Sequence, residues 1–296
     1  MLDLLNPTLI LVIFYTVFIC QIGLLSVYYP VRIADRVNYV MDHYPQSDYP
    51  NLYPNYTEGQ EQRTKRNMAI FKAVNFGIAG LGLFILGAMI GSGYTPDMKG
   101  GDEIFVMIFF MLQTLPMIYI QLREVKYYKN MQKQFKNPVR KAGLKARKIS
   151  DYISPFALIT AGGLYLLWLI YFLSEQGAVT TWPIEVFFTV TLITGMNIAY
   201  ILYCRRMIFG KKIDPYKADK DQHIMVKATV HVMVISSIMI SVFLSAVEFA
   251  DRNNLEVFDP PLISFYLQMC AVMGLGLTLK TMNIKDMQFD VYKDEN

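Results

Sequence analysis

The feature that most constrains this chain is a series of seven long apolar stretches separated by charged segments. A helix that crosses a bilayer needs roughly 20 mostly apolar residues. Seven such stretches in 296 residues, with 54% of the chain hydrophobic, leave too little polar sequence to cover a soluble globule. The sequence therefore predicts an all-α integral membrane protein with seven transmembrane helices. The stretches are Thr8–Val27, Ala69–Ile90, Ile104–Leu122, Pro155–Leu173, Ile184–Tyr203, Val230–Phe249 and Leu262–Leu279.

The distribution of Lys and Arg predicts how these helices are oriented, because short loops rich in the two residues stay cytoplasmic. Of the 28 Lys and Arg residues, all but Lys72, Lys99 and Arg252 lie in the segments after the first, third, fifth and seventh stretches. We therefore expect an N-terminus outside and a C-terminus in the cytoplasm, in a plasma membrane or bacterial inner membrane. No basic region precedes the first stretch, so we expect that stretch to remain in the mature protein.

After the first helix, the chain can be divided into three helix hairpins. Gln113, Thr191 and Gln268 recur in the second helix of each hairpin, at intervals of 78 and 77 residues. Such a repeat would relate the hairpins as parallel units around an axis along the membrane normal. Identity between the hairpins is low, so a chance alignment of apolar helices is an open alternative. The predicted units are a first transmembrane helix (1–28), a loop (29–67), hairpin 1 (68–125), a basic loop (126–150), hairpin 2 (151–205), a second basic loop (206–226), hairpin 3 (227–282) and a tail (283–296).

Three Tyr-Pro pairs recur between residues 44 and 54 of the predicted cytoplasmic loop 29–67. Proline restricts its own residue and the preceding one to extended or turn geometry, so we expect a stiff, non-helical segment there, apart from a short surface helix near residues 34–42. The aromatic rings could pack on the protein itself, on a second copy in a homo-oligomer, or on a protein partner. The paired residues are Tyr44, Pro45, Tyr49, Pro50, Tyr53 and Pro54.

The segment Gln132–Lys148 is strongly basic. Membrane lipid with anionic head groups at the cytoplasmic face is the partner that this charge predicts. The ordinary cytoplasmic bias of Lys and Arg explains the charge equally well. Because topology accounts for the charge, we expect no nucleic-acid binding.

Polar side chains within the apolar stretches are few, and such residues mark solute paths or interhelical hydrogen bonds. We predict that Gln113, Thr114, Asn197 and Gln268 line a pathway. Pro116 follows Gln113 within the same stretch and should kink its helix, because proline cannot donate a backbone hydrogen bond. The opposing interpretation is that the amides only bond between helices.

Signatures of catalysis are missing from the sequence. There is no His/Cys/Asp cluster with metal-ligand spacing, no P-loop or dinucleotide-binding motif and no nucleophile elbow. We therefore expect no enzyme activity, no metal and no cofactor. The leading hypothesis is a channel-like or transport pathway for a small solute. The alternative is a non-catalytic scaffold or subunit of a larger membrane complex, acting through its helix faces and the Tyr-Pro loop.

Overall fold

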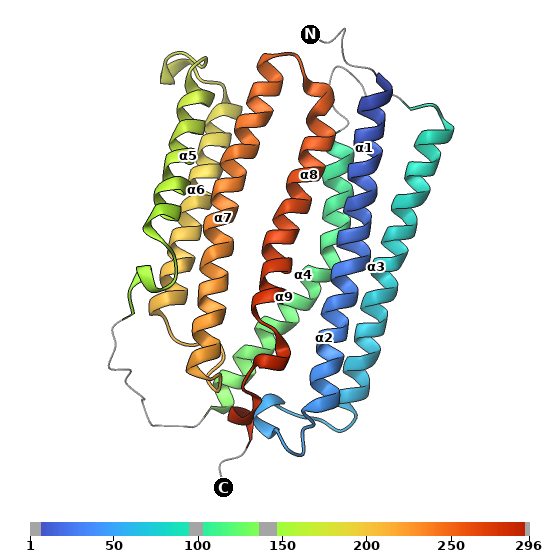
Figure 1. The fold of residues 1–296 in the computed structure, drawn as a ribbon, viewed down its shortest axis with the longest axis vertical. Helices are drawn as coiled ribbons and strands as arrows, with labels where there is room; N and C mark the ends of the chain where they lie inside the picture. The colour runs from blue at the N-terminus through green and yellow to red at the C-terminus, as the bar shows by residue number, and fades with distance from the viewer. Residues whose placement is uncertain (1–6, 95–102, 136–146, 294–296) are drawn as a thin grey trace.

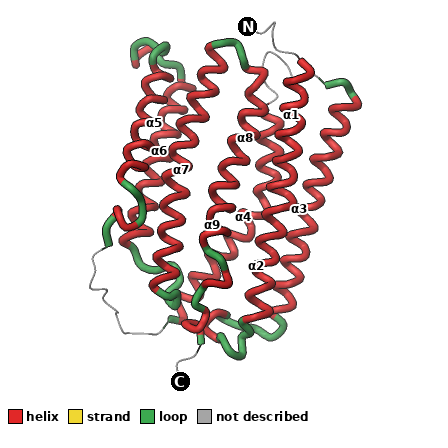
Figure 2. Tube along the Cα trace, viewed as in Figure 1, coloured by secondary structure: helices red, strands yellow, loops and turns green. Residues whose placement is uncertain are grey.

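The computed structural model describes residues 7–94, 103–135 and 147–293, and this part of the chain is almost entirely helical (Figures 1 and 2). Seven of its helical segments are long and apolar enough to span a membrane. The loops lie at the two ends of the bundle (Figure 2). One end is near the N-terminus of the chain and the other end is near the C-terminus. We refer to these as the N-terminal end and the C-terminal end. The prediction of an all-α fold with seven helices long and apolar enough to span a membrane is confirmed within the described residues.

The first span is longer than the sequence predicted. It runs without a break through α1 (Pro7–Ile22), a π-helical turn (Gly23–Tyr28) and α2 (Tyr29–His43). The predicted end at residue 28 and the predicted loop from 29 are therefore corrected, and the connecting loop is residues 44–59. In a regular α-helix Pro30 would collide with the carbonyl group four residues earlier. The wider π turn directly before it changes that spacing: the N–H of Tyr29 bonds the carbonyl of Leu24.

Helices α3 (Gln60–Gly91) and α4 (Glu103–Gln134) pack beside this first span. Their contact is close at Gly82, where an added Cβ would lie 2.5 Å from the ring of Phe109 and 2.8 Å from Ile22. Only glycine fits such an approach without movement of a neighbour. The surrounding core is aromatic: the ring of Phe18 is fully buried and its centroid lies 5.1 Å from that of Phe109.

Helices α5 (Pro155–Leu173), α6 (Ile184–Phe209) and α7 (Asp219–Arg252) form a second group, with α7 packed against both α5 and α6. Ser154 caps α5, because its hydroxyl accepts a hydrogen bond from the N–H of Ala157 at 3.2 Å. Figure 1 shows this α5–α7 group beside the remaining helices. The second basic loop is shorter than the predicted 206–226, because α6 continues to Phe209 and α7 begins at Asp219.

The last span contains α8 (Asp259–Ala271), a second π turn (Val272–Gly276) and α9 (Leu277–Thr281). Helix α8 packs on α1 and α4, and α7 contacts both α8 and α9. We call α1–α4 with α8 and α9 the first group. The first basic loop was predicted as 126–150, but its first residues, up to Gln134, belong to α4. Residues 136–146 of that predicted loop lie outside the described chain.

The outer surface of the bundle exposes large apolar side chains, such as Phe156 at 77% and Ile170 at 67%. In each of the seven apolar windows at most 39% of the residues are buried inside the protein. Such an apolar surface is unfavourable in water, and lipid covers it in an integral membrane protein.

Candidate functional site

Five polar side chains meet in the interior of the first group, within the apolar stretches of three spans. Gln21 and Ser26 come from the first span, Gln113 from α4, and Ser264 and Gln268 from α8. All five are buried, and the most exposed, Gln268, shows 7% of its surface. We call this set the Gln/Ser cluster.

The Gln/Ser cluster is a chain of hydrogen bonds in which each side chain donates to the next. Gln268 donates to Ser264 at 3.4 Å, and Ser264 donates to the carbonyl oxygen of Gln21 at 2.5 Å. Gln21 donates to Gln113 at 2.9 Å, and Gln113 donates to Ser26 at 2.9 Å. A series of this kind polarises its members and strengthens each bond in a low-dielectric interior.

Irregular backbone lies next to the cluster in the first and last spans, whereas α4 is continuous α-helix through Pro116. Ser26 belongs to the π turn of the first span, the π turn of the last span begins four residues after Gln268, and Pro116 lies inside α4 three residues after Gln113. π-helical turns are rare and are often found at functional sites. The side chain of Tyr29, the residue after the first π turn, reaches the second one: an added Cβ at Gly276 would lie 2.8 Å from its hydroxyl oxygen.

The four residues that the sequence assigned to a pathway separate into two places. Gln113 and Gln268 belong to the Gln/Ser cluster. Asn197 lies on α6, where it accepts a hydrogen bond from Ser237 of α7 at 2.5 Å and donates to its own helix. The hydroxyl of Thr114 donates to the carbonyl of Met111 in α4 at 2.9 Å.

Sequence reasoning did not include Ser26 and Ser264 among the site residues. Ser264 precedes Gln268 by four positions, a spacing that puts both on one helix face, and could have been found from that spacing. The five-residue separation of Gln21 and Ser26 gave no such signal, because five residues share a face only where the helix widens into a π turn.

Asn75 of α3 is a further buried polar side chain in the first group, with no exposed surface. Its amide nitrogen donates to the carbonyl of Phe71 at 2.8 Å. Within the described residues its side-chain oxygen accepts no hydrogen bond. A buried unpaired amide oxygen is unfavourable in an apolar environment, so Asn75 is a weak point of the packing.

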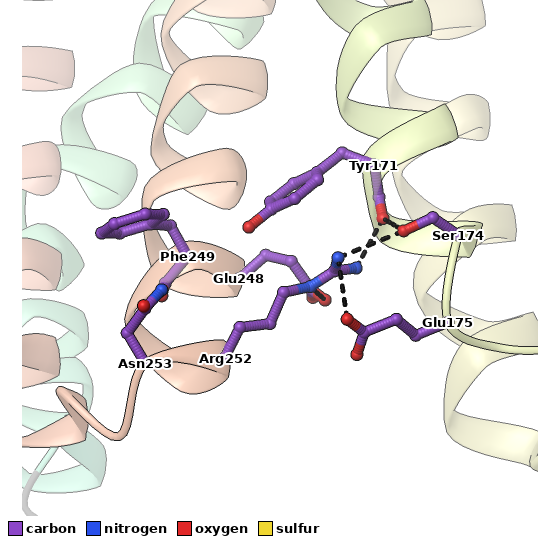
Figure 3. Close-up of polar contacts among 7 residues, drawn as sticks. All are labelled: Tyr171, Ser174, Glu175, Glu248, Phe249, Arg252 and Asn253. Atoms are coloured by element: carbon purple, nitrogen blue, oxygen red, sulfur yellow. Dashed lines mark hydrogen bonds and ion pairs between the residues drawn. The ribbon is translucent and has the colours of Figure 1, made fainter.

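A second polar site lies at the N-terminal end of the α5–α7 group, where Arg252 joins α7 to α5 (Figure 3). Arg252 pairs with Glu248 at 2.7 Å and with Glu175 at 3.2 Å. It also donates to the carbonyl of Tyr171 at 2.6 Å and to the hydroxyl of Ser174 at 3.1 Å. The guanidinium carbon lies 4.0 Å from the centre of the Tyr171 ring, a cation–π contact.

An open pocket of about 480 Å³ lies beside Arg252, between the ends of α5, α6 and α7. Phe172 and Val186 give it an apolar part, and Glu185 and Asp251 add two further carboxylates to Glu175 and Glu248. Within the described residues, no group of three or more His, Cys, Asp or Glu side chains has the geometry to hold a metal ion.

The Tyr-Pro residues of the 44–59 loop pack on other parts of the same chain. Tyr53 and Pro54 are buried, while Tyr44, Pro45, Tyr49 and Pro50 are half-buried. The hydroxyl of Tyr53 donates to the carbonyl of Tyr44, and burial raises the pKa of Tyr53 to about 12. The ring of Tyr44 stacks on Phe289, with centroids 3.9 Å apart.

Comparisons with known proteins were made at three levels. No protein-family model, no curated protein and no solved structure matches this chain.

Proposed function

We propose that this integral membrane protein is a channel-like or transport protein for a small uncharged polar solute, with the Gln/Ser cluster as its constriction. The observation that supports the proposal is the coincidence of the cluster with two π turns and a proline inside the apolar part of three spans. Membrane proteins tolerate broken helical geometry at membrane depth where it is buried in protein or lines a solute path.

The chemistry of the cluster suits a neutral solute. An amide side chain has two donors and an acceptor, and a hydroxyl group can both donate and accept. Gln113 can therefore exchange its bonds to Gln21 and Ser26, and Gln268 its bond to Ser264, for bonds to a solute. The five members of the cluster include no carboxylate and no cationic side chain. An uncharged, hydrogen-bonding solute therefore fits better than an ion, and no catalytic group is required.

The scaffold alternative has two candidate surfaces for a protein partner, the helix faces and the Tyr-Pro loop. In the loop, Tyr44 and Tyr53 instead contact their own chain, through Phe289 and through the hydrogen bond between them. This packing leaves less of the aromatic surface for a partner. The pathway is therefore the better-supported function of the two.

The test is a solute-flux measurement on purified protein in liposomes, with a panel of neutral solutes and ions. We expect wild type to conduct a neutral solute and the Gln113→Leu/Gln268→Leu variant to lose most of that flux. Ser245→Ala is the control, because Ser245 lies on α7, outside the cluster, and its hydroxyl donates to the carbonyl of Ser241 in its own helix. Absence of flux across the whole panel by folded wild-type protein would refute the proposal and favour the scaffold.

A further inference from the structure

The last described residues, Met282–Lys293, cross the C-terminal end of the bundle as an extended segment with two short 3-10 turns, Ile284–Asp286 and Phe289–Tyr292. We call this segment the C-terminal strap. Figure 1 shows it between the beginning of α7 and the loop that follows α2. It therefore lies where the α5–α7 group and the first group meet.

The strap is bonded to the α5–α7 group through two buried carboxylates. The hydroxyl of Tyr292 donates to Asp214, in the connection between α6 and α7, at 2.5 Å. The backbone N–H of Gln288 donates to Asp221, in the first turn of α7, at 2.9 Å. Asp214 and Asp221 are only 3% and 7% exposed, so the strap satisfies charges that are withdrawn from water.

A buried lysine, Lys217, lies between the two carboxylates in the sequence and is affected by the charges of both. Lys217 is 4% exposed, and burial lowers its pKa while the charges of Asp214 and Asp221 act in the opposite direction. Burial and the charge of Asp214 raise the pKa of Tyr292, which keeps its hydroxyl protonated as a donor. The strap thus completes a compact charged cluster at the end of the α5–α7 group.

The other side of the strap is bonded to the first group. Phe289 stacks on Tyr44 with ring centroids 3.9 Å apart. Arg36 of α2 contacts the sulfur of Met287 at 3.8 Å, and Asn51 of the 44–59 loop donates to the carbonyl of Lys293 at 3.1 Å. The strap therefore contacts both groups: Gln288 and Tyr292 bond to the α5–α7 group, and Phe289 packs on the first group.

We infer that the C-terminal strap is a releasable latch, which holds the α5–α7 group against the first group at the C-terminal end of the bundle. Short segments without regular helix, held by a few side-chain contacts, open at lower free energy than the helices they join. Within the spans, by contrast, α7 contacts α8 and α9 along a continuous seam. Release of the strap would remove its contacts at this end, where Gln132 of α4 also donates to the carbonyl of Ile213 and the ring of Phe135 packs on Tyr216. The N-terminal part of the seam would stay packed. This inference does not depend on the identity of a solute.

The experiment measures the distance between the two groups in the full-length protein. Spin labels are placed at Arg66→Cys, exposed on α3, and at Lys211→Cys, exposed between α6 and α7, after replacement of the three native cysteines. Pulsed electron resonance in lipid nanodiscs then gives the distance distribution. We expect Tyr292→Phe/Phe289→Ala to raise the population of a longer distance about tenfold, as loss of a hydrogen bond to a buried charge predicts.

Tyr56→Phe is the control, because Tyr56 is an exposed tyrosine of the 44–59 loop. It should leave the distance distribution unchanged. If the double variant does not fold, Asp214→Asn weakens the same latch while retaining a hydrogen-bond acceptor, and should produce a smaller shift in the same direction. If the double variant folds and its distance distribution equals that of wild type, the latch is overturned. If only Asp214→Asn folds, an unchanged distribution in that variant overturns the latch. Because the readout is a distance, its failure is distinguishable from an absence of solute flux.

Discussion

Gln21 donates a hydrogen bond of 2.9 Å to Gln113 across 92 positions of the sequence, and neither side chain exposes more than 1% of its surface. Each amide also has a second partner: Gln21 accepts from Ser264, and Gln113 donates to Ser26. The pair is therefore the centre of the Gln/Ser cluster, and joins the first span to α4 next to the π turn of the first span.

The energetic coupling of this pair can be measured. Gln21→Leu should destabilise the protein by about 1–3 kcal/mol, because it leaves buried groups of Gln113 and Ser264 without a partner. Gln113→Leu should reduce the free energy of unfolding less in the Gln21→Leu variant than in wild type, because the bond between the two residues is already lost. A double-mutant cycle on unfolding in detergent micelles checks this expectation. Strict additivity of the two changes would contradict a direct bond.

Gly82 offers a test of packing between α3, α4 and the first span. Gly82→Ala places a methyl group 2.5 Å from the ring of Phe109 and should destabilise the protein by about 1–3 kcal/mol, as overpacked cores do. Gly80→Ala is the matched control on the same helix, since no atom lies within 4 Å of its added Cβ. The measurement is the unfolding free energy of each variant. Equal effects of the two changes would be inconsistent with the close approach.

The pKa of Tyr53 predicts alkaline sensitivity at the C-terminal end. Its folded-state pKa of about 12 exceeds the ordinary value of 10.0, so the contribution of its neutral hydroxyl is present below pH 10 and is lost as the pH rises from 10 to about 12. A shift of this size corresponds to at most about 3 kcal/mol. Wild type should therefore lose more stability than Tyr53→Phe over that range. Parallel stability curves would argue against a buried hydroxyl.

Arg252 provides a link between α5 and α7 that a lysine cannot reproduce. The planar guanidinium reaches Glu248, Glu175 and the carbonyl of Tyr171 at the same time. Arg252→Lys should therefore lower the melting temperature, although it keeps the charge. Lys129→Arg, at an exposed position of α4, is a control for the exchange of the two residue types. A melting temperature unaffected by Arg252→Lys would mean that charge alone accounts for the link.

The sequence by itself determined the class and the number of spans. Hydropathy is a local property, so Ile104–Leu122 or Pro155–Leu173 can be recognised as membrane helices without knowledge of their neighbours. The same reasoning selected Gln113 and Gln268 as exceptional residues, because a polar side chain in an apolar stretch needs a partner. The side of the membrane that each end faces stays a prediction from the charge distribution.

Only the tertiary structure decided which partners those residues have. The end of the apolar stretch at Val27 and the prolines that follow predicted a loop from residue 29, whereas a π turn accommodates Pro30 and the helix continues to His43. Hydrogen bonds between positions as distant as Gln21 and Gln113, or Asp214 and Tyr292, depend on how helices pack, and local periodicity contains no information on that packing. The Gln/Ser cluster and the C-terminal strap are products of this long-range arrangement.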